Sequence, residues 1–362
     1  MKEIFLIGDI IKIHSNFYYV RTDGIIFECK IREKLKKEKA EVFVGDSVRL
    51  AEVNFDSNQA VITEVLERNN FIPRPSIANI DQIIIVAALF QPELDLIQLN
   101  RYLAHAKLYN IPAIICINKA DIENKEEIKS QIISIYEPLG YKIVFTSAKT
   151  GMGIEEFKRV LEEKRSVLCG TSGVGKSSLL NKLHPGLSLK TKQVSAKTLR
   201  GTHATRHIEL LDIPLDENKM AVVADTPGFS YLKFDNVFPD VINGLFEEIK
   251  NLSQDCYFSD CLHLSEDGCN ILVNIDKIAP SRYESYRIFV NEALEYKEKI
   301  TYSGHKVEER FKTLDTRNKS KVKIVKINTQ AREQSRKTQK QKMNLISILD
   351  NTYYNNEEDS QD

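Results

Sequence analysis

A glycine-rich segment near the middle of the chain carries residue types that bind the phosphates of a nucleotide. Gly170-x-x-x-x-Gly175-Lys176-Ser177 follows the apolar run "SVLC" and opens the helical stretch "SSLLNKL". Glycines let successive backbone N–H groups turn inward around phosphates, and the start of the helix adds its positive dipole end. Lys176 would reach the β and γ phosphates, and Ser177 would bind Mg²⁺. This context predicts a Walker A loop. Its nucleotide contacts are expected from Gly170, Thr171, Ser172, Gly173, Val174, Gly175, Lys176, Ser177 and Ser178.

Two shorter segments earlier in the chain are typical of guanine recognition. The first, Asn118-Lys119-Ala120-Asp121, ends the apolar run "IICIN", and the second, "FTSAK", contains Ser147 and Ala148. A carboxylate that accepts two N–H bonds from guanine rejects adenine, because adenine would leave buried polar groups unpaired. The amides of the Ser-Ala pair would face guanine O6. The two segments occur in the order that a GTP-binding fold uses, so they predict GTP rather than ATP as the ligand.

The order of the motifs along the chain is permuted. In an ordinary GTPase the phosphate loop precedes the base-reading segments, whereas here it follows them. The run "ADTPG" comes last and supplies Asp225, which can hold Mg²⁺ through water, and Gly228, whose N–H can sense the γ-phosphate. The set corresponds to a GTPase chain cut after this segment and rejoined elsewhere, which is possible where termini lie close together. The segment after Gly228 then runs directly into the C-terminal part, so the nucleotide state can act on that part.

The segment "LRGTHATRHIEL" lies between the phosphate loop and Asp225 and reads as a switch. Thr205 is the candidate Mg²⁺ ligand, with Thr202 as the rival. His203 is the candidate catalytic residue that orients the attacking water, although a loop histidine can also be simply solvated. Phe229 follows Gly228, where many GTPases place a water-orienting glutamine, so slow hydrolysis is expected unless a partner assists.

A cluster of cysteines and a histidine follows the last apolar strand. Cys256-x-x-x-x-Cys261-x-His263-x-x-x-x-x-Cys269 supplies three thiolates and one imidazole, the tetrahedral set of a structural zinc site. The alternative is three free cysteines beside a surface histidine, but the surrounding sequence is too polar to bury cysteines by packing alone. Basic residues after the cluster would suit RNA phosphates or could form a solvated face.

The periodicity of the rest of the chain predicts three kinds of structure. Short β-segments separated by turn residues fill the first 68 residues and indicate a small barrel of the oligonucleotide-binding kind, or a generic barrel without a ligand. The proline-containing run "RNNFIPRPS" is interpreted as a linker. Continuous apolar runs then alternate with helical stretches, which is typical of a doubly wound α/β sheet. A helical stretch, "SRYESYRIFVNEALEYKEKI", and a basic, then acidic tail complete the chain.

Composition sets outer bounds on the function. The chain has 362 residues, 42% of them hydrophobic, with 51 Lys and Arg balanced by 51 Asp and Glu, so net charge neither predicts nor excludes a polyanionic partner. No apolar run approaches the about 18 residues that a membrane helix needs. We therefore expect a cytoplasmic location, without a cleavable leader or a membrane segment.

Together these residues resemble one known family, the circularly permuted GTPases of the RsgA (YjeQ) type that depend on the small ribosomal subunit. The resemblance covers nearly the whole chain. It is carried by "NKAD", "TSAK", "GTSGVGKSS", "DTPGF" and "DCLHLSEDGC" followed by "SRYESY". The family's switch usually reads Gly-Arg-His-Thr-Thr-Thr, so its catalytic histidine maps onto His203 and its middle threonine onto Thr205 of "GTHATR".

The resemblance implies a multidomain fold. We expect an oligonucleotide-binding barrel over residues 1–68, a circularly permuted α/β P-loop GTPase domain over 69–231, a zinc-binding helical domain over 232–305 and a tail over 306–362. One structural Zn²⁺, Mg²⁺ with GTP, and a monomer that binds GTP and GDP without contacting a membrane are also expected. The implied function is late maturation of the small ribosomal subunit, with binding to its rRNA and release on GTP hydrolysis.

Two other functions remain open on the residues alone. A GTP-gated RNA-binding module with negligible turnover is favoured by Phe229 and the altered switch. An ATP-dependent P-loop enzyme is disfavoured by Asn118 and Asp121.

Overall fold

The chain folds into two compact units. The computed structural model describes residues 5–38, 40–122, 126–184, 186, 208–216, 218–225, 232–302, 311–315 and 321–325. The first unit comprises Met1–Leu94, Ile111–Ser130 and Tyr141–Ser230, and the second comprises Asp95–Asn110, Gln131–Gly140 and Tyr231–Asp362.

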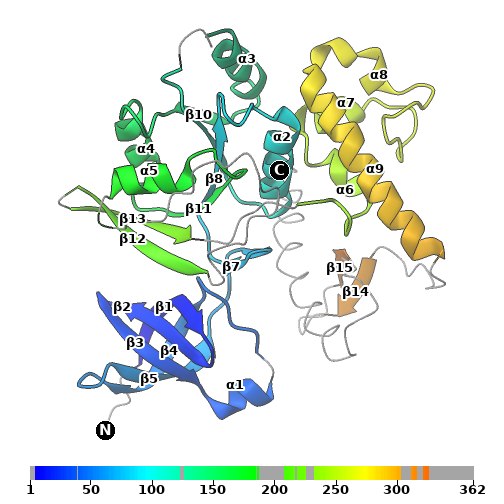
Figure 1. Cartoon of the computed structure of the whole chain (residues 1–362). Helices are drawn as coiled ribbons and strands as arrows, with labels where there is room; N and C mark the ends of the chain where they lie inside the picture. Colours follow the sequence, from blue (N-terminus) through cyan, green and yellow to red (C-terminus); the bar gives the residue numbers. More distant parts are fainter. Residues whose placement is uncertain are drawn as a thin grey trace, which may run out of the picture. The chain divides into compact units, whose positions relative to one another are not determined.

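The N-terminal part of the first unit is a closed five-stranded barrel (Figure 1). Its elements are β1 (Leu6–His14), β2 (Phe17–Thr22), β3 (Ile25–Ile31), α1 (Glu33–Lys37), β4 (Ser47–Asn54) and β5 (Gln59–Val65). The strand order is β1-β2-β3-β5-β4, and antiparallel pairing of β4 with β1 closes the sheet. Alternate residues of the strands point inward, so Ile10, Val20, Phe27, Leu50 and Ile62 form a solvent-free core. The predicted barrel is confirmed.

The segment interpreted as a linker is a folded hairpin, so that interpretation is wrong. Strands β6 (Phe71–Pro73) and β7 (Ser76–Ala78) pair with each other. Arg68 attaches the hairpin to the barrel, because its Nε donates to the buried carboxylate of Asp46 at 2.6 Å and its guanidinium lies over the Phe43 and Phe71 rings. The two prolines predicted an extended chain. The sequence around them gives no local signal for the hairpin, because Asp46, which binds Arg68, is remote in sequence.

The rest of the first unit is a mostly parallel sheet in the order β10-β9-β8-β11-β13-β12 (Figure 1). Its strands are β8 (Gln82–Ala88), β9 (Ala113–Asn118), β10 (Lys142–Phe145), β11 (Arg165–Cys169), β12 (Glu209–Asp216) and β13 (Lys219–Asp225). Five of these, all except β12, are the continuous apolar runs expected of buried parallel strands. β12 was not predicted, because it contains Pro214 and its residues alternate in polarity. It pairs antiparallel with β13.

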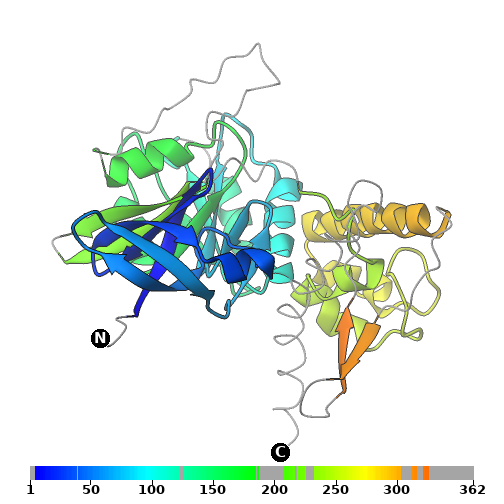
Figure 2. The ribbon, with the colours of Figure 1, turned by 90° about the horizontal axis from the view of Figure 1, so that it is seen from below.

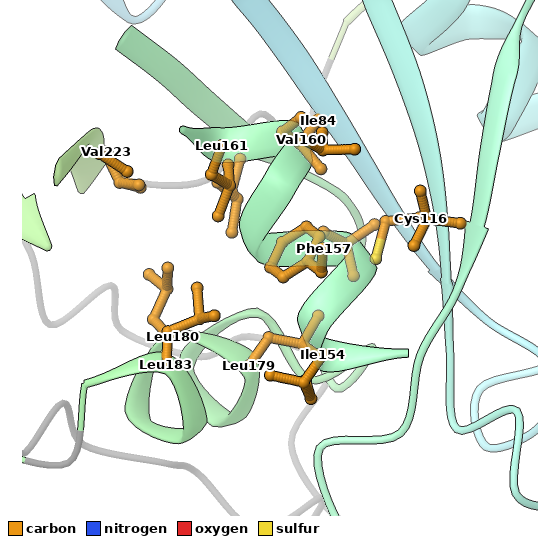
Figure 3. Close-up of a cluster of buried hydrophobic side chains, with 14 of the residues drawn as sticks. Ile84, Cys116, Ile154, Phe157, Val160, Leu161, Leu179, Leu180, Leu183 and Val223 are labelled. Atoms are coloured by element: carbon orange, nitrogen blue, oxygen red, sulfur yellow. The ribbon is translucent and has the colours of Figure 1, made fainter. Parts of the chain in front are cut away.

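Two helices, α4 (Ile154–Leu161) and α5 (Lys176–Leu183), pack on this sheet. Figure 3 shows Phe157 of α4 in the middle of the cluster, with Leu179 of α5 next to Ile154 of α4. Phe157 and Leu179 are fully buried, so the helix that begins at the phosphate loop is fixed to the core by its apolar face.

The second unit is helical. It contains α2 (Leu96–Leu108), α6 (Pro239–Asn243), α7 (Glu247–Ser253), α8 (Asn270–Val273), a 3₁₀ turn (Ile275–Lys277) and the long α9 (Pro280–Tyr302), whereas α3 (Glu126–Tyr136) spans both units. In Figure 2, α9 runs alongside the shorter helices that it covers. In the predicted tail, β14 (Phe311–Asp315) and β15 (Lys321–Val325) form an antiparallel pair, which the sequence did not indicate.

Helix α2 packs with the C-terminal helices through buried polar groups. Asn100 is fully buried and accepts hydrogen bonds from Tyr136 Oη at 2.8 Å and from Arg282 at 3.1 Å, while its Nδ2 donates to Ser285 at 2.9 Å. Arg282 also pairs with Glu248 at 2.6 Å. A buried network in which each member has a partner specifies one arrangement, so α2 and α9 form one body.

Candidate nucleotide site and metal centre

The phosphate loop connects the buried strand β11 to helix α5, as predicted. Gly170 and Gly175 adopt φ values of 144° and 98°, which other residues rarely reach. A Cβ on Gly170 would lie 2.1 Å from the Val86 carbonyl oxygen, and one on Gly175 would lie 2.3 Å from Asn118 Nδ2. Both glycines are therefore required by backbone conformation and by close packing against neighbouring strands.

Lys176 lies at the first position of α5 and turns back over the loop. Its Nζ donates to the carbonyl oxygens of Gly170 at 2.6 Å and Thr171 at 3.0 Å. Burial lowers the pKa of Lys176, and the neighbouring Cys169 offsets part of this shift. A desolvated ammonium beside the N-terminus of a helix attracts phosphate strongly, because water does not compete for it.

Asn118 joins the base-reading segments to the phosphate loop. Its side chain is buried, and Nδ2 donates to the Val174 carbonyl at 2.8 Å. Its Oδ1 accepts from the Ala148 amide at 3.2 Å and lies 3.4 Å from Thr146 Oγ1. One side chain thus contacts two segments that are far from it in sequence, "FTSAK" and the phosphate loop, so the structure brings the predicted motifs into one site. The spacing of the motifs alone gave no sign of this contact.

The other base-reading residues lie beside Asn118. Ala120 donates its amide to the Thr146 carbonyl at 3.0 Å, which holds the "NKAD" segment against the end of β10. Lys119 has φ 60° and its Nζ contacts the Gln91 carbonyl, a partner that sequence analysis missed. Asp121 is half-buried next to it, and Ser147 is fully buried. The backbone bond from Ala120 to Thr146 therefore keeps "NKAD" and "FTSAK" next to each other.

The predicted Mg²⁺ and switch residues are described only in part. Ser177 lies in the first turn of α5. Asp225 is the last residue of β13, and the pairing of Ala224 with Val167 of β11 places its backbone next to the strand that leads into the phosphate loop. Thr202, His203, Thr205, Gly228 and Phe229 lie outside the described residues.

The four metal-ligand candidates come together in the second unit. The ligand atoms of Cys256, Cys261, His263 and Cys269 all lie within 4.8 Å of one another. His263 Nδ1 is 3.6 Å from Cys256 Sγ and 3.5 Å from Cys269 Sγ, so the imidazole faces the thiols. Three sulfur atoms and one nitrogen at this spacing fit a tetrahedral zinc ion. Burial raises the pKa of the Cys261 thiol to about 12, which means that metal binding must displace its proton.

Glu266 orders the loop that carries these ligands, and sequence analysis missed it. Its carboxylate accepts from the amides of Leu262 and Leu264 at 2.8 Å and of Ser265 at 3.0 Å. Burial alone would raise the pKa of Glu266, but the backbone N–H groups outweigh it and the pKa is lowered. The Tyr283 hydroxyl adds a bond to the His263 carbonyl at 2.8 Å. Such outer partners orient metal ligands. The only signal for Glu266 in the sequence is an acidic residue between two ligand positions.

Among the helices that the structure describes, none combines the length and the apolar character that crossing a membrane requires.

Comparison with known proteins agrees with this geometry. Residues 7–62 match the RsgA N-terminal domain and residues 65–235 match the RsgA GTPase. The small ribosomal subunit biogenesis GTPase RsgA of Caldanaerobacter subterraneus subsp. tengcongensis is 40% identical over 299 residues, which cover 82% of this chain and 98% of that protein. Its namesake from Bacillus cytotoxicus is 41% identical over 294 residues, which cover 80% of this chain and 98% of that protein.

Two solved structures are also similar. The crystal structure of YjeQ from Thermotoga maritima is 34% identical with a TM-score of 0.68, covering 80% of this chain and 99% of that one. The crystal structure of YloQ, described as a circularly permuted GTPase, is 32% identical with a TM-score of 0.67, covering 81% and 96%. With its closed barrel, permuted nucleotide motifs and near full-length similarity to these proteins, the chain belongs to the RsgA family of GTPases.

Proposed function

We propose that this GTPase acts in the late maturation of the small ribosomal subunit, binds its rRNA and is released when GTP is hydrolysed. The observation that carries the nucleotide part is the contact of Asn118 with Val174 and Ala148, because it assembles base readers and phosphate loop into one site. The names of the similar bacterial proteins support the ribosomal part.

Within this proposal each group of nucleotide residues has a defined role. Asp121 accepts the guanine N–H groups, and the Ser147-Ala148 segment donates to guanine O6 once guanine is bound. The backbone of Gly170–Ser178 and the Lys176 ammonium hold the phosphates. Asp225 would hold Mg²⁺ through water, the Gly228 N–H would sense the γ-phosphate, and His203 would orient water for its hydrolysis.

Two metal ions belong to the proposed function. Ser177, with Thr205, would hold Mg²⁺, which supplies charge neutralisation between the β and γ phosphates. Cys256, Cys261, His263 and Cys269 would hold one structural Zn²⁺. In that case the zinc ion would fix the chain between α7 and α8, which the structure describes as turns and bends.

The surface of the barrel supports an RNA partner. Lys30 lies 5.5 Å from the centre of the Phe17 ring, and α1 presents the exposed lysines Lys34 and Lys37. Phe55 is 54% exposed on the same domain. Lysines for phosphate groups and an exposed aromatic residue for base stacking on one domain suit an RNA strand with accessible bases. We further propose that the protein is monomeric and cytoplasmic, with domain boundaries near residues 68, 231 and 305.

Co-sedimentation with purified ribosomal subunits tests this proposal. With a non-hydrolysable GTP analogue, the protein should pellet with small subunits and not with large ones, and GDP should weaken the association. GTP turnover should rise when small subunits are added. Equal pelleting with both subunits would contradict the assignment of the partner, and unchanged turnover would favour a GTP-gated binding module.

A further inference from the structure

The barrel contacts the parallel sheet of the first unit through charged side chains. Asp9 of β1 pairs with Arg165 of β11, and Arg21 of β2 pairs with Asp212 of β12. Lys12 of β1 pairs with Glu209 at 3.0 Å, and the backbones of these two residues are also paired, which joins β1 to β12. We call these the barrel–sheet ion pairs. They connect the barrel to β11, which leads into the phosphate loop, and to β12, which is separated from β11 by β13.

Arg165 occupies a special position among these residues, because it is the first residue of the strand that ends at the phosphate loop. Gly170 follows directly after Cys169, the last residue of β11. Besides the ion pair, the Arg165 amide donates to Asp81 Oδ2 at 2.7 Å and its carbonyl accepts from the Asp81 amide at 2.9 Å. Asp9 is held in turn by Ser47 Oγ at 2.7 Å. The N-terminal end of β11 is therefore clamped between barrel and sheet.

The strand itself is stiff. Ser166 and Val167 are fully buried, Leu168 and Cys169 nearly so, and Ser166 accepts a hydrogen bond from Gln82 at 2.9 Å. A close-packed strand moves as a unit rather than bending, so a change at Arg165 is carried to Gly170.

The contact between barrel and sheet at this point is polar. A cavity of about 350 Å³ is lined there by Ser47, Glu67, Asn69, Asn79, Asp81 and Arg165. Ionic contacts beside water adapt to small displacements at low cost, unlike an apolar core in which side chains interlock. A ligand on the barrel could thus change these pairs without unfolding either part.

We propose that Arg165, held by Asp9, is a positioning residue through which the barrel sets the geometry of the phosphate loop. Occupancy of the barrel and affinity for nucleotide are then linked, and by reciprocity each changes the other by the same factor. The proposal needs only nucleotide binding by this GTPase, so it stands or falls separately from the identity of the ribosomal partner.

A double-mutant cycle on the isolated, full-length protein tests this. Arg165→Gln, Asp9→Asn and the double variant are titrated with fluorescently labelled GDP and GTP analogue, and their melting temperatures are measured. The matched control is Arg49→Gln with Glu64→Asn, which breaks a 2.8 Å ion pair between neighbouring barrel strands. Each single test variant should weaken nucleotide binding about five-fold, and the double variant should be no weaker than the singles.

The control variants should leave nucleotide affinity unchanged even if they lower the melting temperature. Test variants that melt earlier but bind nucleotide within two-fold of the original protein would show a purely structural role. Additive losses in the double variant would show that Asp9 and Arg165 do not act through each other. If Arg165→Gln fails to fold, Arg165→Lys replaces it, because lysine keeps the charge. Arg165→Lys must then bind nucleotide more tightly than Asp9→Asn does. If it does not, the proposal fails.

Discussion

Replacing His105 by phenylalanine should make the second unit less sensitive to acid. His105 lies on α2 and is 4% exposed. Its ring stacks on Phe234 with 4.3 Å between centroids and 10° between planes, and within the described part of the chain neither ring nitrogen has a hydrogen-bond partner. Burial, and then the charge of Arg101, lower the pKa of His105 from 6.5 to about 3. The nearby carboxylate of Glu292 accepts hydrogen bonds from the Arg101 guanidinium and from the Phe234 amide.

The sign and size of the effect follow from linkage between protonation and folding. The pKa of the buried ring is about 3 in the folded chain and returns to 6.5 on unfolding, so the unfolded state binds more protons at intermediate pH. The contribution of His105 to stability is complete above pH 6.5 and is lost as pH falls towards 3. Between about pH 8 and about pH 5 the unfolding free energy should fall by about 2 kcal/mol on this account.

Hydrogen exchange of peptides from α2 and α9, measured from pH 8 to pH 5 and corrected for intrinsic rates, reports the stability of this unit. The wild-type protein should lose about 2 kcal/mol more than His105→Phe and than His105→Leu. All three proteins keep the cysteine and histidine cluster, so acid effects on a bound metal cancel in the difference. If the three pH profiles run parallel to within about 0.5 kcal/mol, the ring is not buried in its neutral form and the reasoning is refuted.

Four further outcomes test the sites. Asp121→Asn should exchange guanine for xanthine preference, since the new amide places a donor where guanine needs an acceptor, and competition assays that show equal GTP binding would contradict this. Lys176→Ala should abolish productive binding by removing a buried cation, a loss of several kcal/mol, and wild-type turnover would show that the loop is not the site. Asn118→Ala should weaken nucleotide binding by about 1–3 kcal/mol because the Val174 carbonyl loses its donor, measurable by calorimetry. Cys261→Ser should unfold the C-terminal part and spare the sheet, and less than about half a zinc ion per freshly purified wild-type chain would oppose the tetrahedral assignment.

Much of the fold could be predicted because its signals are local. The five barrel strands and the apolar strands β8, β9, β10, β11 and β13 follow from alternating or continuous apolar patterns, which a short window of sequence records. The phosphate loop was likewise predictable, because its glycines and lysine act through neighbouring backbone. The grouping of Cys256, Cys261, His263 and Cys269 followed from spacing, and the structure brings these residues together.

Features that depend on partners remote in sequence were not predictable. The hairpin between barrel and sheet is held by Arg68 and Asp46, and β12 forms despite Pro214 because β13 offers it a pairing edge. Helix α2 looked like an ordinary covering helix of an α/β sheet. Only the buried bonds of Asn100 to residues more than thirty positions away show that it packs with the C-terminal helices.

The sequence by itself determined which chemistry is available: a lysine and backbone amides for phosphates, a carboxylate for guanine, and a thiolate and imidazole set for zinc. It did so because each motif is a short segment whose residue types and spacing already imply the chemistry. The tertiary structure decided how these segments cooperate. Asn118 reaches the phosphate loop and Arg165 reaches the barrel only because the sheet places strands from distant parts of the chain side by side, and hydrogen bonds and ion pairs act over a few ångströms of space rather than along the sequence.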